Sequence, residues 1–186
     1  MKKCIISSLF FSIILLISSC RRLKYVFKSD KELASNKIEE VMSTIENKDK
    51  EKLTSLFSKN TVEDVITLDS KMDELFTYYK GNKESFSTGL SSEEGTEKNG
   101  DYFKLVSISS DIKTTLDTFR LFILWSQVDE RNIDDEGIQS LYILRFGDDP
   151  YSHYIDESGE EHCLSYWGDG KRTPGINIGK IYEEND

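Results

Sequence analysis

The stretch from Thr118 to Phe146 constrains the fold of this chain more than any other part. Residues 119–125, FRLFILW, and residues 139–146, QSLYILRF, are rich in the β-branched, aromatic and aliphatic side chains that favour strands. The polar segment 129–137 lies between them and ends in a glycine. The pattern therefore predicts two antiparallel strands joined by a loop.

Both faces of this hairpin are apolar. Side chains alternate along a strand, so the first arm presents two apolar sets: Phe119, Leu121, Ile123 and Trp125 on one face, and Phe122 and Leu124 on the other. A sheet with one face in water would alternate apolar with polar residues instead. We therefore expect helices to cover one face, and a ligand, a partner or more of the chain to cover the other.

The N-terminal segment has the features of an export signal. Lys2 and Lys3 precede an apolar run at residues 4–17, and two serines follow that run. The run is shorter than the roughly 20 residues that a helix needs to span a bilayer. Residues 1–19 are therefore predicted to be a cleaved signal peptide rather than a membrane-spanning helix.

Residues 17–20, ISSC, resemble the lipobox of bacterial lipoproteins, in which the cysteine receives a diacylglyceryl group and becomes the first residue of the mature chain. The resemblance implies that Cys20 carries a lipid anchor with palmitate-type acyl chains, on the extracytoplasmic face of the cell membrane. An ordinary secretory signal followed by an incidental cysteine is the alternative. Residues 20–29 are then a membrane-proximal linker, whose cations either face anionic lipid or are merely solvated: Arg21, Arg22, Lys24 and Lys28.

Cysteine and charge counts limit what the exported part can do. Cys4 leaves with the signal and Cys20 takes the lipid, so Cys163 has no intrachain disulfide partner. Loss of the two lysines of the signal lowers the net charge from −10 by two units, to −12. Nucleic acid is disfavoured as a partner, because the chain is strongly acidic and the sequence shows no basic face outside the linker. Residues 30–182 are predicted to form one domain that is held by its hydrophobic core.

Three helices are predicted before the sheet. Ser29 lies three residues before Glu32, which is the spacing of a capping box, and should begin the first helix. Asp49 can cap a short second helix. Thr61 and Asp64 resemble a cap ahead of the third, which ends at Gly81. The apolar residues that recur at helical spacing are Ile38, Val41, Met42 and Ile45, then Leu53, Leu56 and Phe57, and then Val65, Leu68, Met72, Leu75, Phe76 and Tyr79.

The hydrophobic period then changes from that of a helix to that of a strand. Residues 84–88 and 102–112 predict two strands ahead of the hairpin, and the polar segment 91–100 is predicted to be a loop. Helices followed by strands indicate an α+β fold. We expect three N-terminal helices packed on a curved antiparallel β-sheet.

The C-terminal stretch 165–178, SYWGDGKRTPGINI, resembles the signature of an uncharacterised family of Gram-positive bacterial lipoproteins, a domain of unknown function. Residues 47–49, NKD, and 56–58, LFS, match the same pattern, and the resemblance covers most of the mature chain. It implies a nuclear-transport-factor-two-like cone, a cystatin-like α+β fold. Since that superfamily holds both enzymes and binding modules, the resemblance implies fold more than function.

Catalytic and metal-binding patterns are weak. Cys163 and His162 are neighbours on a strand and so point to opposite faces, which disfavours a nucleophile and its base. A zinc site formed by His153, His162 and Cys163 would have irregular ligand spacing and no obvious fourth ligand. Residues 170–173 resemble part of a phosphate loop, but the earlier glycines are missing and Pro174 prevents the helix that should follow. No catalytic residue, metal or cofactor is predicted.

Three functions fit these observations. The favoured one is a lipid-anchored, non-catalytic module that binds a small ligand or a protein partner. The alternatives are a small hydrolase or isomerase that uses the same cavity, and a structural envelope protein that forms a homodimer through its sheet. For a binding site on the concave side of the sheet, five residues are predicted: Tyr79, Arg120, Trp125, Tyr142 and Arg145. The competing interpretation is that the aromatic ones simply fill the core.

Overall fold

The computed structural model describes the following residues: 29–97, 99–146 and 173–179, with the backbone alone of 153–155 and 161–163. The chain divides into two units, Met1–Leu33 and Ala34–Asp186. In the first unit, Ser29 Oγ accepts a hydrogen bond from the backbone N–H of Glu32 at 3.2 Å, which confirms the predicted capping spacing. None of the helices in the described ranges is long and apolar enough to cross a membrane.

The described part of the chain has four helices ahead of the sheet: α2 (Asp30–Asn47), α3 (Lys50–Leu56), α4 (Lys59–Asp64) and α5 (Leu68–Tyr78). Three were expected; the third corresponds to α5, and α4 is an additional short helix that contains Thr61 and Asp64, the residues predicted to cap the third. Val65, Ile66 and Thr67 separate the two, and three successive β-branched residues lower helix propensity. Ser58 caps α4, since its Oγ accepts a hydrogen bond from Thr61 N at 3.2 Å.

A mixed sheet of six strands follows within the described residues, in the order β1-β3-β4-β5-β8, with β2 also paired to β3. The strands are β1 (Lys83–Phe86), β2 (Gly89–Thr96), β3 (Tyr102–Thr114), β4 (Thr118–Asp129), β5 (Gly137–Arg145) and β8 (Gly175–Ile178). The α+β class is confirmed, and the cone that the resemblance implies stays a prediction.

The direction of β8 corrects the expectation of a purely antiparallel sheet. β8 runs parallel to β5, so that Ser140 pairs with Gly175 and Ile143 with Ile178. Parallel neighbours require a long connection, and residues 146–174 are long enough to provide one. The other pairings between these six strands are antiparallel.

β2 corrects a second expectation, because residues 91–100 were predicted to be a loop. β2 pairs with β3 from Gly89 opposite Ser109 to Thr96 opposite Tyr102. It lies at the edge of the sheet and its side chains are mostly exposed. An exposed edge strand is held by backbone pairing and needs no apolar alternation, so its sequence resembles that of a loop.

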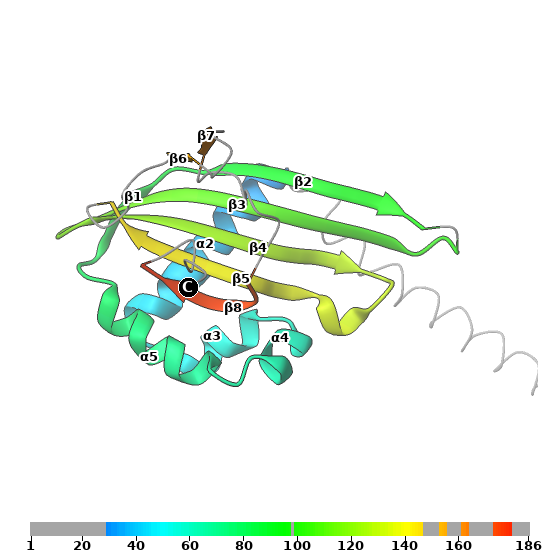
Figure 1. The fold of residues 1–186 in the computed structure, drawn as a ribbon, viewed down its shortest axis with the longest axis horizontal. Coiled ribbons are helices and arrows are strands. Elements are labelled where there is room, and N and C mark those ends of the chain that lie inside the picture. Colours follow the sequence, from blue (N-terminus) through cyan, green and yellow to red (C-terminus); the bar gives the residue numbers. More distant parts are fainter. Residues whose placement is uncertain (1–28, 98, 147–152, 156–160, 164–172, 180–186) are drawn as a thin grey trace, which may run out of the picture. The chain divides into compact units, whose positions relative to one another are not determined.

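The central hairpin has the predicted form. β4 and β5 pair with Leu121 opposite Ile143 and Ile123 opposite Leu141. Residues 34–47 of α2 and the helices α3 to α5 lie on one side of the sheet (Figure 1). The opposite side has its own buried cluster, in which Phe122, Tyr142 and Leu144 are 5 %, 3 % and 2 % exposed. Both faces are therefore covered, as the apolar pattern predicted.

The buried carboxylate of Asp129 holds the connection between β4 and β5 through hydrogen bonds. Asp129 is 4 % exposed and accepts hydrogen bonds from Arg131 Nε and Nη2 at 2.8 and 2.6 Å. The Arg131 guanidinium holds the pKa of Asp129 below its usual range, although burial opposes this shift. Asp129 Oδ1 also accepts a hydrogen bond from the backbone N–H of Asn132, the N-cap of the short 3₁₀ helix η1 (Ile133–Asp135).

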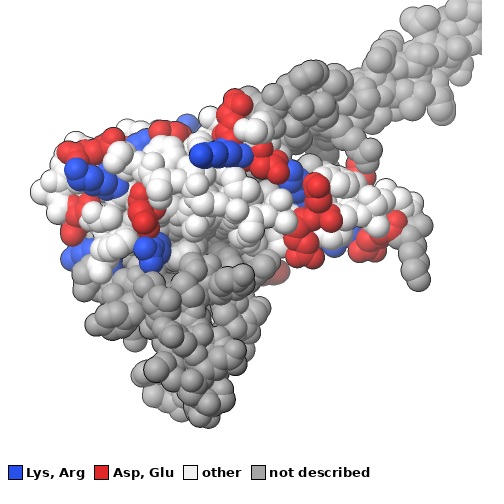
Figure 2. Space-filling view, turned by 90° about the horizontal axis from the view of Figure 1, so that it is seen from above, with Lys and Arg blue, Asp and Glu red and all other residues white. Residues whose placement is uncertain are grey.

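Charges of both signs lie close together on the surface. In Figure 2, lysine and arginine side chains are seen next to acidic ones. Two ion pairs link edge strands to β3: Lys113 with Glu84 at 3.2 Å, and Lys104 with Glu94 at 3.8 Å. Exposed pairs of this kind contribute at most about 1 kcal/mol each, so the fold depends mainly on its core.

Candidate functional site

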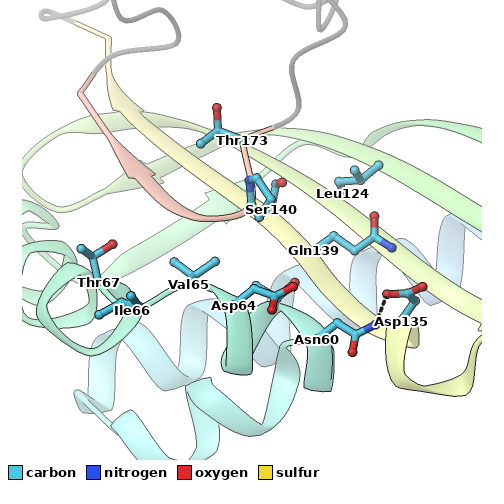
Figure 3. A pocket seen from close by; sticks show the side chains of 12 residues that line it. Asn60, Asp64, Val65, Ile66, Thr67, Leu124, Asp135, Gln139, Ser140 and Thr173 are labelled. Carbon is cyan, nitrogen blue, oxygen red and sulfur yellow. Dashed lines mark hydrogen bonds between the residues drawn. The ribbon is translucent and has the colours of Figure 1, made fainter.

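An open cavity of about 720 Å³ lies where α4, the α4–α5 connection, β5 and the start of β8 meet (Figure 3). Most of its exposed surface is apolar, although eight of the twelve lining residues carry hydroxyl, amide or carboxylate groups. The described residues that line it are Asn60, Thr61, Asp64, Val65, Ile66, Thr67, Leu124, Asp135, Gln139, Ser140, Thr173 and Pro174.

One wall of the cavity depends on a close approach of α4 to β5. Ser58 N donates a hydrogen bond to Ile138 O at 2.9 Å, and Phe57 forms a parallel bridge with Ile138. Gly137 makes this approach possible, because a Cβ there would lie only 2.6 Å from Ser58 N. Its φ of +131° is also one that other residues rarely adopt.

The polar side of the cavity is held by hydrogen bonds between α4 and η1. Asn60 Nδ2 donates to Asp135 Oδ1 at 2.7 Å, a contact drawn in Figure 3. Lys59 Nζ donates to Asp134 Oδ2 at 2.8 Å, and this hydrogen bond is the main reason why the pKa of Lys59 is raised. These contacts hold the first turn of α4 against η1.

The apolar side is formed by Val65 and Ile66 from the α4–α5 connection, by Leu124 on β4 and by Pro174. Gly175 allows β8 to reach this wall, since a Cβ there would lie 2.9 Å from Val65 Cγ1. Ile66 is 97 % exposed at the rim. A large apolar side chain in that position is available to a ligand.

Ser140 supplies a buried polar group. It is 1 % exposed, and its Oγ has no hydrogen-bond partner among the described residues. It lies opposite Leu124 in the sheet, and both line the cavity. A buried hydroxyl without a partner costs roughly 1–3 kcal/mol, so such groups usually bind water or a ligand.

The polar groups of the described lining are carboxylates, amides and hydroxyls. The described lining contains no histidine, lysine, arginine or cysteine. A serine nucleophile needs a hydrogen-bonded base, and Ser140 Oγ has none among the described residues. The described residues also hold no group of three or more potential metal ligands.

The five predicted pocket residues are divided between the two faces of the sheet. Tyr79 and Trp125 lie on the side of the helices. Tyr79 is 7 % exposed, and its ring centroid lies 5.0 Å from that of Phe119. Lys37 Nζ lies 4.8 Å from the ring centroid of Trp125. Burial, and then the nearby carboxylate of Glu46, raise the pKa of Tyr79.

Two of the five lie on the opposite side. Arg120 Nε donates to Asp111 Oδ1 at 3.0 Å. Tyr142 is buried, and its hydroxyl accepts a hydrogen bond from Thr173 N at 2.9 Å. The remaining residue, Arg145, lies at the end of β5, where its backbone N–H donates to the Tyr78 hydroxyl at 2.7 Å.

None of these five lines the cavity, although Tyr142 contacts Thr173, which does. Ligand contacts at Tyr79, Arg120, Trp125, Tyr142 and Arg145 therefore stay a prediction. The lining of this cavity comes from positions that carry no catalytic or aromatic pattern. The β-branched run 65–67 and the turn at Pro174 were the available signals, and they indicate irregular backbone rather than a ligand.

Some predicted features lie outside the described residues: the signal segment with Cys20, the turn around Trp167, and the side chains of His153, His162 and Cys163. For the last three only the backbone is described. β6 (His153–Ile155) and β7 (Glu161–Cys163) form a separate antiparallel pair, with His153 opposite Cys163 and Tyr154 opposite His162.

The chain matches a known family over more than half of its length. Residues 40–146, more than half of the 186-residue chain, match the family described as "Domain of unknown function (DUF5104)". The match includes α4, η1 and β5, but ends before the Thr173–Pro174 side of the cavity. It also includes the 47–49 and 56–58 stretches of the predicted resemblance. No curated protein matches the chain.

Proposed function

The chain belongs to the DUF5104 family of unknown function, and we propose that it is a lipid-anchored, extracytoplasmic protein that binds a small ligand without transforming it. The observation that carries the proposal is the cavity between α4 and β5 with the buried, unpartnered hydroxyl of Ser140. Small-molecule sites typically measure about 300–1,000 Å³, with mostly apolar walls and a few placed polar groups. The volume of this cavity lies in that range, and most of its exposed surface is apolar.

The alternative of a dimer through the sheet has less support. Phe122 and Leu124, which form one apolar face of β4, are 5 % and 2 % exposed in the single chain, and Leu121 and Ile123 of the other face are 0 % exposed. They have little area left to bury against a partner. The cavity, in contrast, is open and has Ile66 exposed at its rim.

The proposal predicts that a substitution at the mouth of the cavity blocks binding. Thr67 lines the mouth, is exposed, and makes no side-chain cap hydrogen bond, so Thr67→Trp should fold normally and narrow the entrance. The measurement is an NMR screen of the isotope-labelled full chain against a library of small aliphatic and aromatic compounds. We expect at least one compound to shift the backbone signals of Asn60, Ser140 and Thr173, and Thr67→Trp to weaken that compound at least about tenfold.

The matched control is Ser70→Trp, because Ser70 is exposed on α5 and does not line the cavity. It should leave the affinity unchanged. Ligand binding at this site is rejected if no compound shifts the signals of the lining residues in the parent chain.

The anchor gives a separate prediction. If Cys20 receives the lipid, Cys20→Ala should remove acyl labelling and leave an uncleaved or soluble chain, since the thiol is the point of attachment. Metabolic labelling with a palmitate analogue, followed by membrane fractionation, measures both effects. Acyl labelling that persists in Cys20→Ala would contradict the anchor, and Cys4→Ala is the control that should leave labelling intact.

A further inference from the structure

The charged groups of the cavity are all acidic. Asp64 and Asp135 are the charged residues in the described lining, and no lysine, arginine or histidine is among them. Figure 3 shows both carboxylates at the same hollow, one from α4 and one from η1. A ligand with a negative charge would meet repulsion here, and one with a positive charge would meet attraction.

The two carboxylates differ in how far they are already occupied. Asp135 accepts hydrogen bonds from the side-chain amides of Asn60 at 2.7 Å and Asn132 at 2.9 Å. Asp64 is exposed, and its carboxylate has no hydrogen-bond or ion-pair partner among the described residues. Asp64 is therefore the carboxylate that is available to a ligand.

The nearest lysine in sequence is already engaged. Lys59 lies on α4, as Asp64 does, but its Nζ donates to Asp134 at 2.8 Å and lies 3.9 Å from Glu63. The charge of Lys59 is therefore paired with Asp134 on η1 and lies near Glu63 on the next turn of α4. The charge of Asp64 is left without a cation from its own helix.

A second, independent observation indicates that the cavity takes a ligand at all. Ser140 lines the same cavity; its side chain is 1 % exposed, and its Oγ is buried without a hydrogen-bond partner among the described residues. Val65, Leu124 and Pro174 provide apolar surface in the same cavity. Carboxylate, apolar wall and buried hydroxyl together match a molecule with a cationic end and an apolar body.

Resting on the proposed function, we infer that the cavity selects small amines: molecules with a protonated amino group next to an aliphatic or aromatic body. Asp64 provides the countercharge at the mouth, and the Val65–Leu124–Pro174 surface receives the apolar body. Because Asp64 is exposed, the charge contributes selectivity rather than most of the affinity.

The test uses three probes that share one apolar body and differ in charge: n-hexylamine, n-hexanol and hexanoate at neutral pH. Each is titrated into the isotope-labelled full chain, and the shifts of the Ser140 and Val65 backbone signals give the affinity. We expect hexylamine to bind roughly two- to fivefold more tightly than hexanol, and hexanoate more weakly than hexanol. Raised salt should reduce this preference.

Asp64→Asn should abolish the preference for hexylamine while hexanol binds as before. Glu63→Gln is the matched control, because it removes the same charge from the neighbouring exposed position, which does not line the cavity. It should keep the preference. If both variants lose the preference for hexylamine equally, the preference comes from the overall negative charge of this surface, and the role of Asp64 is overturned.

The outcomes separate this inference from the proposed function. Equal affinities for the three probes, all at the cavity, would overturn the selection of amines and leave ligand binding intact. Absence of binding by all three would also overturn the inference, whereas the proposed function fails only if the wider compound library gives no binder at these residues.

Discussion

Replacing Phe119 with alanine is expected to lower the free energy of unfolding by about 3–5 kcal/mol. Phe119 is 0 % exposed and lies where β4 meets the end of α5. Its ring contacts Tyr78 edge-on at 5.9 Å and Tyr79 at 5.0 Å. Alanine would remove the buried ring and leave a cavity between rigid elements, and each lost aromatic pair adds about 0.5–1.5 kcal/mol.

Urea unfolding of the full chain, followed by circular dichroism, measures this loss. Leu116→Ala is the control, because Leu116 is apolar but 72 % exposed in the neighbouring β3–β4 turn, and it should change stability by less than about 0.5 kcal/mol. A Phe119→Ala variant that loses no more than this control would contradict the packing of α5 on the sheet. Since domains are stable by only about 5–15 kcal/mol, the expected loss is a large share of the total.

Gly137→Ala is expected to cost about 3–4 kcal/mol and to weaken ligand binding as well. The methyl group would meet Ser58 N at 2.6 Å and Phe57 C at 2.8 Å, which are backbone atoms that cannot rotate away. Relief requires α4 to move from β5, which breaks the hydrogen bond from Ser58 N to Ile138 O. Such a movement would also displace Asn60 and widen the cavity.

Gly100→Ala is the matched control for this substitution. Gly100 also has a left-handed φ, of +92°, but nothing lies within 4 Å of the position of its Cβ. Its alanine variant should therefore show the backbone strain alone, roughly 1–2 kcal/mol. Comparable losses in the two variants, by urea unfolding, would show that the contact of Gly137 with Phe57 and Ser58 adds nothing.

Local signals in the sequence were reliable where a single element determines the outcome. Asp49 caps α3 as expected, with Oδ1 accepting a hydrogen bond from Lys52 N at 3.0 Å. The alternation in β4 correctly assigned Ile123 and Phe122 to opposite faces, each with its own buried neighbours. Caps and alternation involve neighbours within a few residues, so no distant contact is needed to read them.

The errors arose where an element depends on its neighbours. β2 has the composition of a loop and is a strand because β3 offers it a complete backbone edge. Thr61 and Asp64 were expected to cap the third helix, but they belong to a separate short helix, α4, and the β-branched run 65–67 lies between it and α5. β8 follows a turn-forming stretch, which contains no information on whether its partner is parallel.

The cavity also depends on contacts between distant segments. The predicted pocket relied on aromatic and arginine residues of the strands and α5, and these lie on two sides of the sheet. The cavity is instead lined by residues of ordinary type, such as Ser140, whose significance is the absence of a hydrogen-bond partner among the described residues. That absence depends on what surrounds the hydroxyl, which no periodicity encodes.

The sequence by itself determined the class of fold, the central hairpin and the two apolar faces of β4, because side-chain alternation is a property of one strand. Only the tertiary structure decided where a ligand has room. The cavity exists because two pairs of distant segments approach closely: Ser58 meets Ile138, and Val65 meets Gly175. Each approach requires a glycine without a Cβ at one point of contact, and the sequence shows the glycine but not the segment that comes to lie against it.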